Sequence, residues 1–500
     1  MAEHLIAIEE ARENLLSCAA FLAEDIKSSD GFAEAMKEII PRYLEKNKVD
    51  LAAELANSID DPFARDRLLT LVAEKCAALD DDEYAFQLVE AIEDYGVQLQ
   101  AREHIALQKS AKGDFTKALE IARTLDHADY AYADIAFRQV ERGDETAALQ
   151  TLGQIEFPTA KVTALQNIAL LEMKKGEIGK AIQLFGKAAQ LADEIEFAEE
   201  KVRAQIEIGD HFVQAKQNGL AIEIFDKAKA NAELIEGIHR DTLLGSIALG
   251  FLEAGSLELA DRALDLVEDK MKMASALVEF SGEFWEKGER DEAVETLEEA
   301  YALLKSQRDS EIRNSRERYT LWREIAVEFA HVEKAERGIE VAQEIIDENE
   351  QTIALRQISQ ICTQQNKDEL VRQSLNSIAD DAQKMFGLIG VGDAKNRQEK
   401  TDEALSFLRE AETLCKSVPQ LASRSAAYNE LARRFFDYGE PGKARELLHE
   451  NLETIAEIRD ESSRAVTLAQ LGDLYEALKF ELNEQEKETL ELMVRKAEWQ

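Results

Sequence analysis

Proline is the scarcest structural signal in this chain of 500 residues, which has only five prolines. The usual share in proteins is about 5%, and a proline inside a helix breaks it. Its scarcity therefore favours a chain that is helical along nearly all of its length. Hydrophobic residues make up 45% of the sequence, which is enough apolar surface for a continuous core.

Cysteine is also rare, and Cys18, Cys76, Cys362 and Cys415 lie far apart without any C-x-x-C pair. Such cysteines are expected as small core residues in a reducing compartment. The first residues, Met1–His4, lack the basic flank of a signal peptide. No stretch approaches the roughly 18 uninterrupted apolar residues of a membrane span. We therefore expect a cytoplasmic protein that makes no membrane contact.

Positively charged residues are also few. The chain has 60 Lys and Arg against 101 Asp and Glu, which gives a net charge of −41. Binding of nucleic acid needs a basic footprint, so no nucleic-acid partner is expected. The motifs H-E-x-x-H and G-x-S-x-G are missing, and the seven histidines are scattered. The glycines of residues 387–393 fall in the register of a repeat described next. We expect no enzymatic activity, no metal site and no cofactor.

What the chain does have is a repeated pair of small residues. Twelve small residues are each followed, twelve positions later, by a second site that is Ala in nine of the twelve cases. The first sites are Ala73, Ala106, Ala136, Ala169, Gly209, Ala248, Ser281, Ala326, Ser359, Gly392, Ala432 and Gly472. The second sites are Ala85, Ala118, Ala148, Ala181, Ala221, Ala260, Ala293, Gly338, Val371, Ala404, Ala444 and Glu484.

The surroundings of these sites predict pairs of antiparallel helices. Hydrophobic or small residues stand one and five positions before each first site, which is the spacing of one helix face. Between the two sites half of the units carry a glycine followed by Asp, Glu or Ser, as in Gly113-Asp114, and glycine is the usual end of a helix. Successive second sites are 30 to 45 residues apart, a period typical of a solenoid.

This arrangement resembles the tetratricopeptide repeat, a helix–turn–helix unit of about 34 residues. An aromatic residue follows the first site by three positions in the longer-spaced units, as in Phe212, Phe251 and Phe329. The closing proline of that family is missing, and Trp322 alone matches its early tryptophan, so a related α-solenoid is the alternative. The resemblance implies an all-α fold, a right-handed α-α superhelix of about 12–13 helix–turn–helix repeats.

We expect three segments in the chain. Residues 1–30 form an N-terminal capping helix, since residues 3–27 show one broad apolar face. Residues 31–480 form the repeat array, with a joint at 301–320 where the spacing stretches to 45. Residues 481–500, which are heavily charged, form a C-terminal capping helix.

The resemblance also implies that the first helix of each unit lines a concave groove. Sixty positions predicted to line it hold ten acids and seven bases, so the groove is expected to be nearly neutral. Its apolar part, suited to an amphipathic helix or an extended peptide or simply packed against neighbouring turns, consists of Tyr130, Phe137, Leu170, Met173, Leu249, Leu252 and Trp285. Its polar part resembles the clamp with which some family members hold a C-terminal carboxylate, the alternative being a solvated lining; it consists of Arg323, Arg356, Asn396, Asn429 and Arg433.

A basic segment stands out in the acidic chain, with Lys305, Arg308, Arg313, Arg316 and Arg318. It is expected either to receive an acidic partner or to form local ion pairs on an extended helix pair. Taken together, these patterns predict a scaffold or adaptor that binds a protein or peptide along its concave face. The alternative is a structural subunit that self-associates through its termini as a homo-oligomer, or a non-catalytic subunit of a larger complex.

Overall fold

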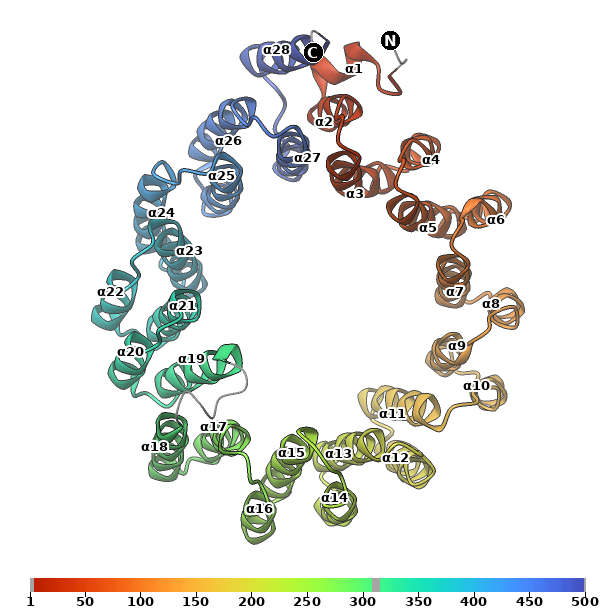
Figure 1. Ribbon diagram of the computed structural model, residues 1–500, viewed down its shortest axis with the longest axis vertical. Coiled ribbons are helices and arrows are strands. Elements are labelled where there is room, and N and C mark those ends of the chain that lie inside the picture. The colour runs from red at the N-terminus through yellow and green to blue at the C-terminus, as the bar shows by residue number, and fades with distance from the viewer. Residues whose placement is uncertain (1–3, 308–314, 499–500) are drawn as a thin grey trace. The chain divides into compact units, whose positions relative to one another are not determined.

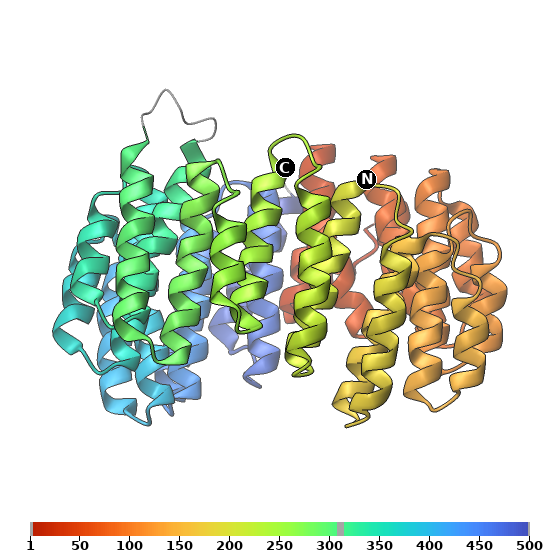
Figure 2. The ribbon, with the colours of Figure 1, turned by 90° about the horizontal axis from the view of Figure 1, so that it is seen from below.

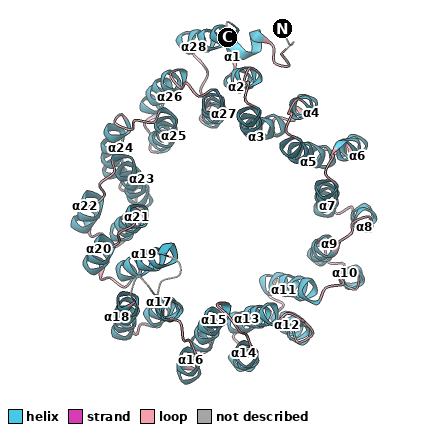
Figure 3. Cartoon of the chain, in the orientation of Figure 1, coloured by secondary structure: helices cyan, strands magenta, loops and turns pink. Residues whose placement is uncertain are grey.

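The computed structural model describes residues 4–307 and 315–498, and in these residues it contains helices and loops but no strand (Figure 3). Chain contacts divide it into two compact units, one made of residues 1–108 and 371–500 and the other of residues 109–370. Each unit is described by itself. The all-α prediction is confirmed.

The first unit contains both the beginning and the end of the chain, and the residues of the second unit lie between them in the sequence (residue colours in Figure 1). Helices of the first unit are α1 (Ile8–Glu13), α2 (Leu15–Glu24), α3 (Ser29–Glu45), α4 (Val49–Asn57), α5 (Pro62–Ala78), α6 (Asp82–Ala91), α23 (Asp381–Arg397), α24 (Thr401–Cys415), α25 (Leu421–Asp437), α26 (Pro441–Ala456), α27 (Glu461–Ala477) and α28 (Glu484–Glu498). The boundary between the units runs through α7 (Tyr95–Lys112) and α22 (Asp368–Asn376).

The second unit contains fourteen helices in its described residues, which stand side by side in Figure 2. They are α8 (Phe115–Ala122), α9 (Asp129–Glu141), α10 (Glu145–Leu152), α11 (Pro158–Lys174), α12 (Ile178–Ala192), α13 (Ala198–Gln214), α14 (Asn218–Ala232), α15 (His239–Glu253), α16 (Leu257–Leu264), α17 (Lys270–Lys287), α18 (Arg290–Ser306), α19 (Ser315–His331), α20 (Ala335–Gln343) and α21 (Glu348–Gln364).

Along the sequence, the described helices from α3 to α26 alternate as first and second members of twelve pairs, and in the pairs that lie within one unit the repeated small sites lie where the two members meet. The hydroxyl of Ser281 on α17 donates to the carbonyl oxygen of Ala293 on α18 at 2.8 Å. A Cβ added to Gly338 on α20 would stand 2.5 Å from the carbonyl oxygen of Ala326 on α19. The predicted close approach of paired helices is therefore confirmed.

The predicted glycine turns are also present. Gly113, Gly143, Gly176, Gly255, Gly288 and Gly439 all have positive φ values between 83° and 89°, the left-handed conformation that ends a helix. Several units place another residue type in the same conformation, such as Lys216 and Glu333 with φ of 58° and 61°. For this reason a search for glycine finds only part of the turns.

The N-terminal segment differs from the single capping helix expected for residues 3–27. Asn14 is extended, with φ −141° and ψ 130°, and separates α1 from α2. Its side-chain oxygen accepts a hydrogen bond from the backbone N–H of Ser17 at 2.9 Å, which is the bond that starts a helix. The N-cap residue Asn14 therefore divides this segment into two helices, whereas its apolar residues alone predicted one continuous helix.

The last first helix, α27, packs most extensively against α2, and its contact with the following helix α28 includes the Tyr475 hydroxyl, which donates to Glu486 Oε1 at 2.9 Å. At the first site Gly472, an added Cβ would lie 3.3 Å from Cβ of Leu15, so glycine lets α2 approach closely. Glu484, the expected second site, is instead exposed at the start of α28. α2 thereby completes a thirteenth pair, and the two ends of the chain meet within one unit.

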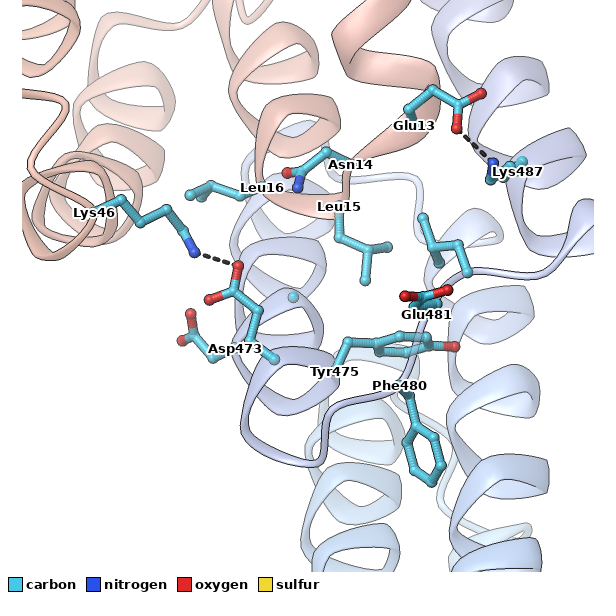
Figure 4. A pocket seen from close by; sticks show the side chains of 13 residues that line it. Glu13, Asn14, Leu15, Leu16, Lys46, Asp473, Tyr475, Phe480, Glu481 and Lys487 are labelled. Carbon is cyan, nitrogen blue, oxygen red and sulfur yellow. Dashed lines mark hydrogen bonds and ion pairs between the residues drawn. The ribbon is translucent and has the colours of Figure 1, made fainter.

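Ion pairs surround this junction of the terminal helices. Arg42 Nε on α3 lies 2.8 Å from Asp473 Oδ2 on α27, and Lys46 pairs with Glu476 one turn further along α27. Lys487 Nζ of α28 lies 2.6 Å from Glu13 Oε2 at the end of α1 (Figure 4). Self-association through the termini would have to displace α2 or use another surface.

Nowhere in the described residues does a helix have the length and apolar composition needed to cross a lipid bilayer. The four cysteines are unpaired and buried.

Candidate partner-binding face

The first helices of the second unit form a row, with the second helices on the other side of the row (Figure 1). We call the accessible surface of α9, α11, α13, α15, α17 and α19 the first-helix face. The small sites turn toward the second helices, so residues elsewhere around each first helix form this face.

A groove of about 600 Å³ runs between α9 and α11 on this face. Three of the predicted apolar residues, Tyr130, Phe137 and Leu170, line it together with Leu171. Tyr130 is 66% exposed, whereas tyrosine usually shows intermediate burial. The sequence prediction that these three residues share one surface agrees with their placement.

Small side chains and one anchored loop give the groove its depth. Ala133, Ala160 and Ala164 line it, and alanine leaves space that longer side chains would fill. The carboxylate of Asp129 on α9 accepts hydrogen bonds from the backbone N–H groups of Glu156 and Phe157 at 3.0 and 2.9 Å. These bonds hold the loop before α11 against the start of α9 and so fix the spacing of the two walls.

The remaining predicted apolar residues do not continue this groove. Leu252 is only 3% exposed and belongs to the core. Met173 and Leu249 are partly exposed on α11 and α15. The guanidinium of Arg290 lies 3.4 Å from the ring centroid of Trp285, at a separate hollow of about 520 Å³ beside the α17–α18 turn. The apolar strip is therefore confined to α9 and α11.

The predicted polar residues are engaged in contacts within the chain. Arg323 Nε lies 2.9 Å from Glu350 Oε2. The side-chain oxygen of Asn396 accepts from the Thr401 hydroxyl at 3.0 Å, and that of Asn429 accepts from the Asn451 amide at 2.8 Å.

Two further arginines complete this predicted polar set. Burial lowers the pKa of Arg356 below its ordinary value, whereas Arg433 is exposed on α25. Arg323 and Arg356 belong to one compact unit and Asn396, Asn429 and Arg433 to the other, and a clamp formed by the five remains a prediction.

The basic segment is likewise described only in part, because Arg308 and Arg313 lie outside the described residues. Lys305 Nζ lies 2.8 Å from Glu344 Oε2, and this pair raises the pKa of Lys305. Arg316 lies in the first turn of α19. The guanidinium of Arg318 lies 5.3 Å from the ring centroid of Trp322. For Lys305 and Arg318 this favours local pairing over an open basic surface.

A feature that the sequence interpretation missed lies next to the groove. Seven carboxylates follow the first-helix face from α13 to α19, and we call them the acidic band: Glu207, Asp210, Glu253, Glu279, Glu286, Glu324 and Glu328. Four of them stand two positions before or after a first site. The sixty positions that were predicted to line the groove do not include these. The expected near-neutrality of the face does not hold here.

The acidic band is crowded enough to change its protonation. Burial, together with Glu253 and Glu207, raises the pKa of Asp210 to about 7. Burial also raises the pKa of Glu279, with Glu324 adding to the effect, and burial raises the pKa of Glu328. Each shift means that the charged carboxylate is held in an unfavourable environment.

The other unit has a smaller groove, of about 380 Å³, between α3, α5 and α7. Phe63 and Arg67 line it, with the guanidinium 5.7 Å from the ring centroid, and His104 lies at the far wall. Hydrogen bonding to Glu74 raises the pKa of His104. The sequence interpretation assigned no site here.

Paired antiparallel helices, small residues at each crossing and left-handed turns together define the architecture. The fold is a tetratricopeptide-like α-solenoid. No known family model and no curated protein matches the sequence.

Solved structures with partial similarity include yeast Tom70, with 16% identity over 90% of this chain and 97% of that chain, and a TM-score of 0.29. Another is Ton1535 from Thermococcus onnurineus NA1, with 19% identity over 71% of this chain and 99% of that chain, and a TM-score of 0.24.

Proposed function

We propose that this protein is an interaction scaffold that binds a protein or peptide along the first-helix face, with the groove between α9 and α11 as its main contact. The exposed Tyr130 beside Phe137 and Leu170 is the observation that carries this proposal. Aromatic and aliphatic side chains around a depression are the usual anchors of peptide recognition.

The lining of the groove suits contacts with a peptide. Besides its apolar side chains it presents Asp134 and Thr163 as hydrogen-bonding groups. Among the described residues, no group of three or more His, Cys, Asp or Glu side chains is placed to hold a metal ion. The groove offers a largely apolar floor with Asn167 and Lys174 along one wall.

Affinity purification with quantitative comparison of variants tests the proposal. We expect Tyr130→Ala combined with Leu170→Ala to reduce recovery of the bound partner at least tenfold, since anchor residues of this kind carry about 2 kcal/mol or more each. The control is Leu149→Ala combined with Leu257→Ala, which truncates two exposed leucines on the second helices α10 and α16. Full recovery of every partner by the groove variant would overturn the proposal.

A further inference from the structure

We propose that the bound segment has two parts, an apolar end that enters the α9–α11 groove and a following stretch rich in Lys and Arg that lies over the acidic band. This inference rests on the proposed function and specifies the chemistry of the partner. Neighbouring first helices are about 10 Å apart, so the path from α11 to α19 is on the order of 40 Å. An extended segment of about a dozen residues covers that distance.

The groove and the acidic band are continuous. Gln166 on α11, which forms one wall of the groove, donates a hydrogen bond to Glu207 Oε2 on α13 at 3.5 Å. The hydroxyl of Thr159, at the start of α11, contacts Glu200 Oε2 on α13 at 3.1 Å. A segment leaving the groove across α11 therefore meets the carboxylates of α13 first.

The acidic band acts as one electrostatic surface, because its members interact from each first helix to the next. Asp210 on α13 interacts with Glu253 on α15. Glu253 interacts with Glu279 and Glu286 on α17, and Glu279 interacts with Glu324 on α19. Like charges in such a row repel, and a cationic partner relieves the repulsion along its whole length.

The protein itself supplies little positive charge to this surface. Within the described residues, Glu324 is the one member of the acidic band with an ion pair, at 3.6 Å from Arg323. Arg323 also pairs with Glu350, as described above. Lys287 interacts with Glu253, but it lies 3.0 Å from Glu283 Oε1 and donates to the carbonyl oxygen of Leu252 at 2.7 Å.

Two histidines on the same helices add no charge at neutral pH. Burial lowers the pKa of His211 on α13 and of His331 on α19. Both imidazoles are therefore neutral at pH 7. Protons, salt or a bound cationic partner must therefore offset the charge of the acidic band that Arg323 and Lys287 leave unbalanced.

The test uses the full chain and a labelled synthetic peptide of about 18 residues, with Leu and Phe in its first half and lysines in its second half. A second peptide carries Glu in place of each Lys. We expect fluorescence anisotropy to show at least tenfold tighter binding of the Lys peptide, with affinity falling as salt rises from about 50 to about 300 mM. Equal binding of both peptides would overturn the inference.

A matched pair of variants separates local recognition from general attraction to an acidic protein. Glu279→Gln, Glu286→Gln and Glu328→Gln together remove three charges from the acidic band and should weaken the Lys peptide at least tenfold. The control set removes three exposed charges on or beside the second helices α14 and α18, and should change binding less than threefold: Glu223→Gln, Glu233→Gln and Glu299→Gln. Equal losses in the two sets would show attraction by net charge alone and would overturn the inference.

The same variants distinguish this inference from the proposed function. If the acidic-band variant keeps the partners that Tyr130→Ala with Leu170→Ala loses, the groove is a binding site and the partner is not cationic. If neither variant loses a partner, the proposed function fails together with the inference. Circular dichroism of each variant confirms that the helical fold is kept.

Discussion

The ring of Phe225 on α14 fills a space that two glycines on neighbouring first helices leave open. An alanine Cβ at Gly209 on α13 would lie 2.3 Å from Phe225 Cε1, and one at Gly250 on α15 would lie 2.4 Å from Cζ. Non-bonded carbons prefer about 3.5–4.0 Å. Phe225 is fully buried, so its ring has no free space into which to move. Gly209→Ala must therefore push α13 and α14 apart.

Two effects of opposite sign decide the outcome. Alanine stabilises a helix interior by about 0.5–1 kcal/mol relative to glycine. Overpacking a well-filled core costs about 1–3 kcal/mol. We expect Gly209→Ala to destabilise its region by about 1–2 kcal/mol. Gly186→Ala, in the middle of α12 where an added Cβ meets nothing within 4 Å, should instead stabilise the protein by up to about 1 kcal/mol.

Amide hydrogen exchange resolved by helix is the suitable assay, because a long repeat array does not unfold as a single two-state unit. Exchange should accelerate in α13, α14 and α15 for Gly209→Ala and should slow in α12 for Gly186→Ala. In a Phe225→Leu background the effect of Gly209→Ala should shrink, since the residues are coupled through contact. Gly209→Ala protein at least as protected as the wild type would refute the packing argument.

Two further predictions concern titration and the terminal junction. The pKa of Asp210 is raised from 3.8 to about 7, so the folded state holds the proton more tightly than the unfolded chain does, and stability should fall as the pH rises from about 4 to about 7. Asp210→Asn should remove this part of the pH dependence of hydrogen-exchange protection in α13, measured relative to intrinsic exchange rates, whereas Asp261→Asn on the exposed side of α16 should leave it unchanged. At the junction, Arg42→Gln with Lys46→Gln removes two partly exposed ion pairs, each worth up to about 1 kcal/mol, and should speed thiol labelling of the buried Cys18 by up to about thirtyfold. Mass spectrometry should show unchanged labelling of Cys362, and equal acceleration at both cysteines would contradict a local opening of α2.

The sequence alone was sufficient to predict the helix pairs, because the first and second small sites report directly on how closely two helices approach. It was not sufficient to predict the partner of α27. Gly472 carries the signal for a close neighbour, but nothing local states that this neighbour is Leu15, more than 450 positions away. Long-range contacts of this kind depend on the geometry accumulated over the whole array.

The candidate site was likewise predictable from the sequence only in part. Tyr130, Phe137 and Leu170 could be assigned to one surface because they share a register with the first sites. The sequence did not predict the acidic band, because Glu207, Glu279 and Glu324 lie two positions before a first site. Residues at this angle around the helix were assigned to neither the core nor the groove. All three residues are exposed, so this angle belongs to the accessible surface of the first helices. Trp285 failed as a groove residue for another reason, since Arg290 on the next helix covers its ring.

The pairing of α2 with α27 also constrains how the protein folds. Leu15, Leu16, Phe21 and Leu22 on α2 are almost fully buried, and part of that burial comes from α27. During synthesis α2 is made first and α27 nearly last, so the contact that completes the thirteenth pair must form after most of the array exists. Closing a loop of this length costs only slightly more entropy than closing a shorter one, whereas contacts of high sequence separation slow folding. The junction is therefore expected to be the last part of the first unit to acquire protection from hydrogen exchange during refolding, after the pairs α3–α4 and α25–α26.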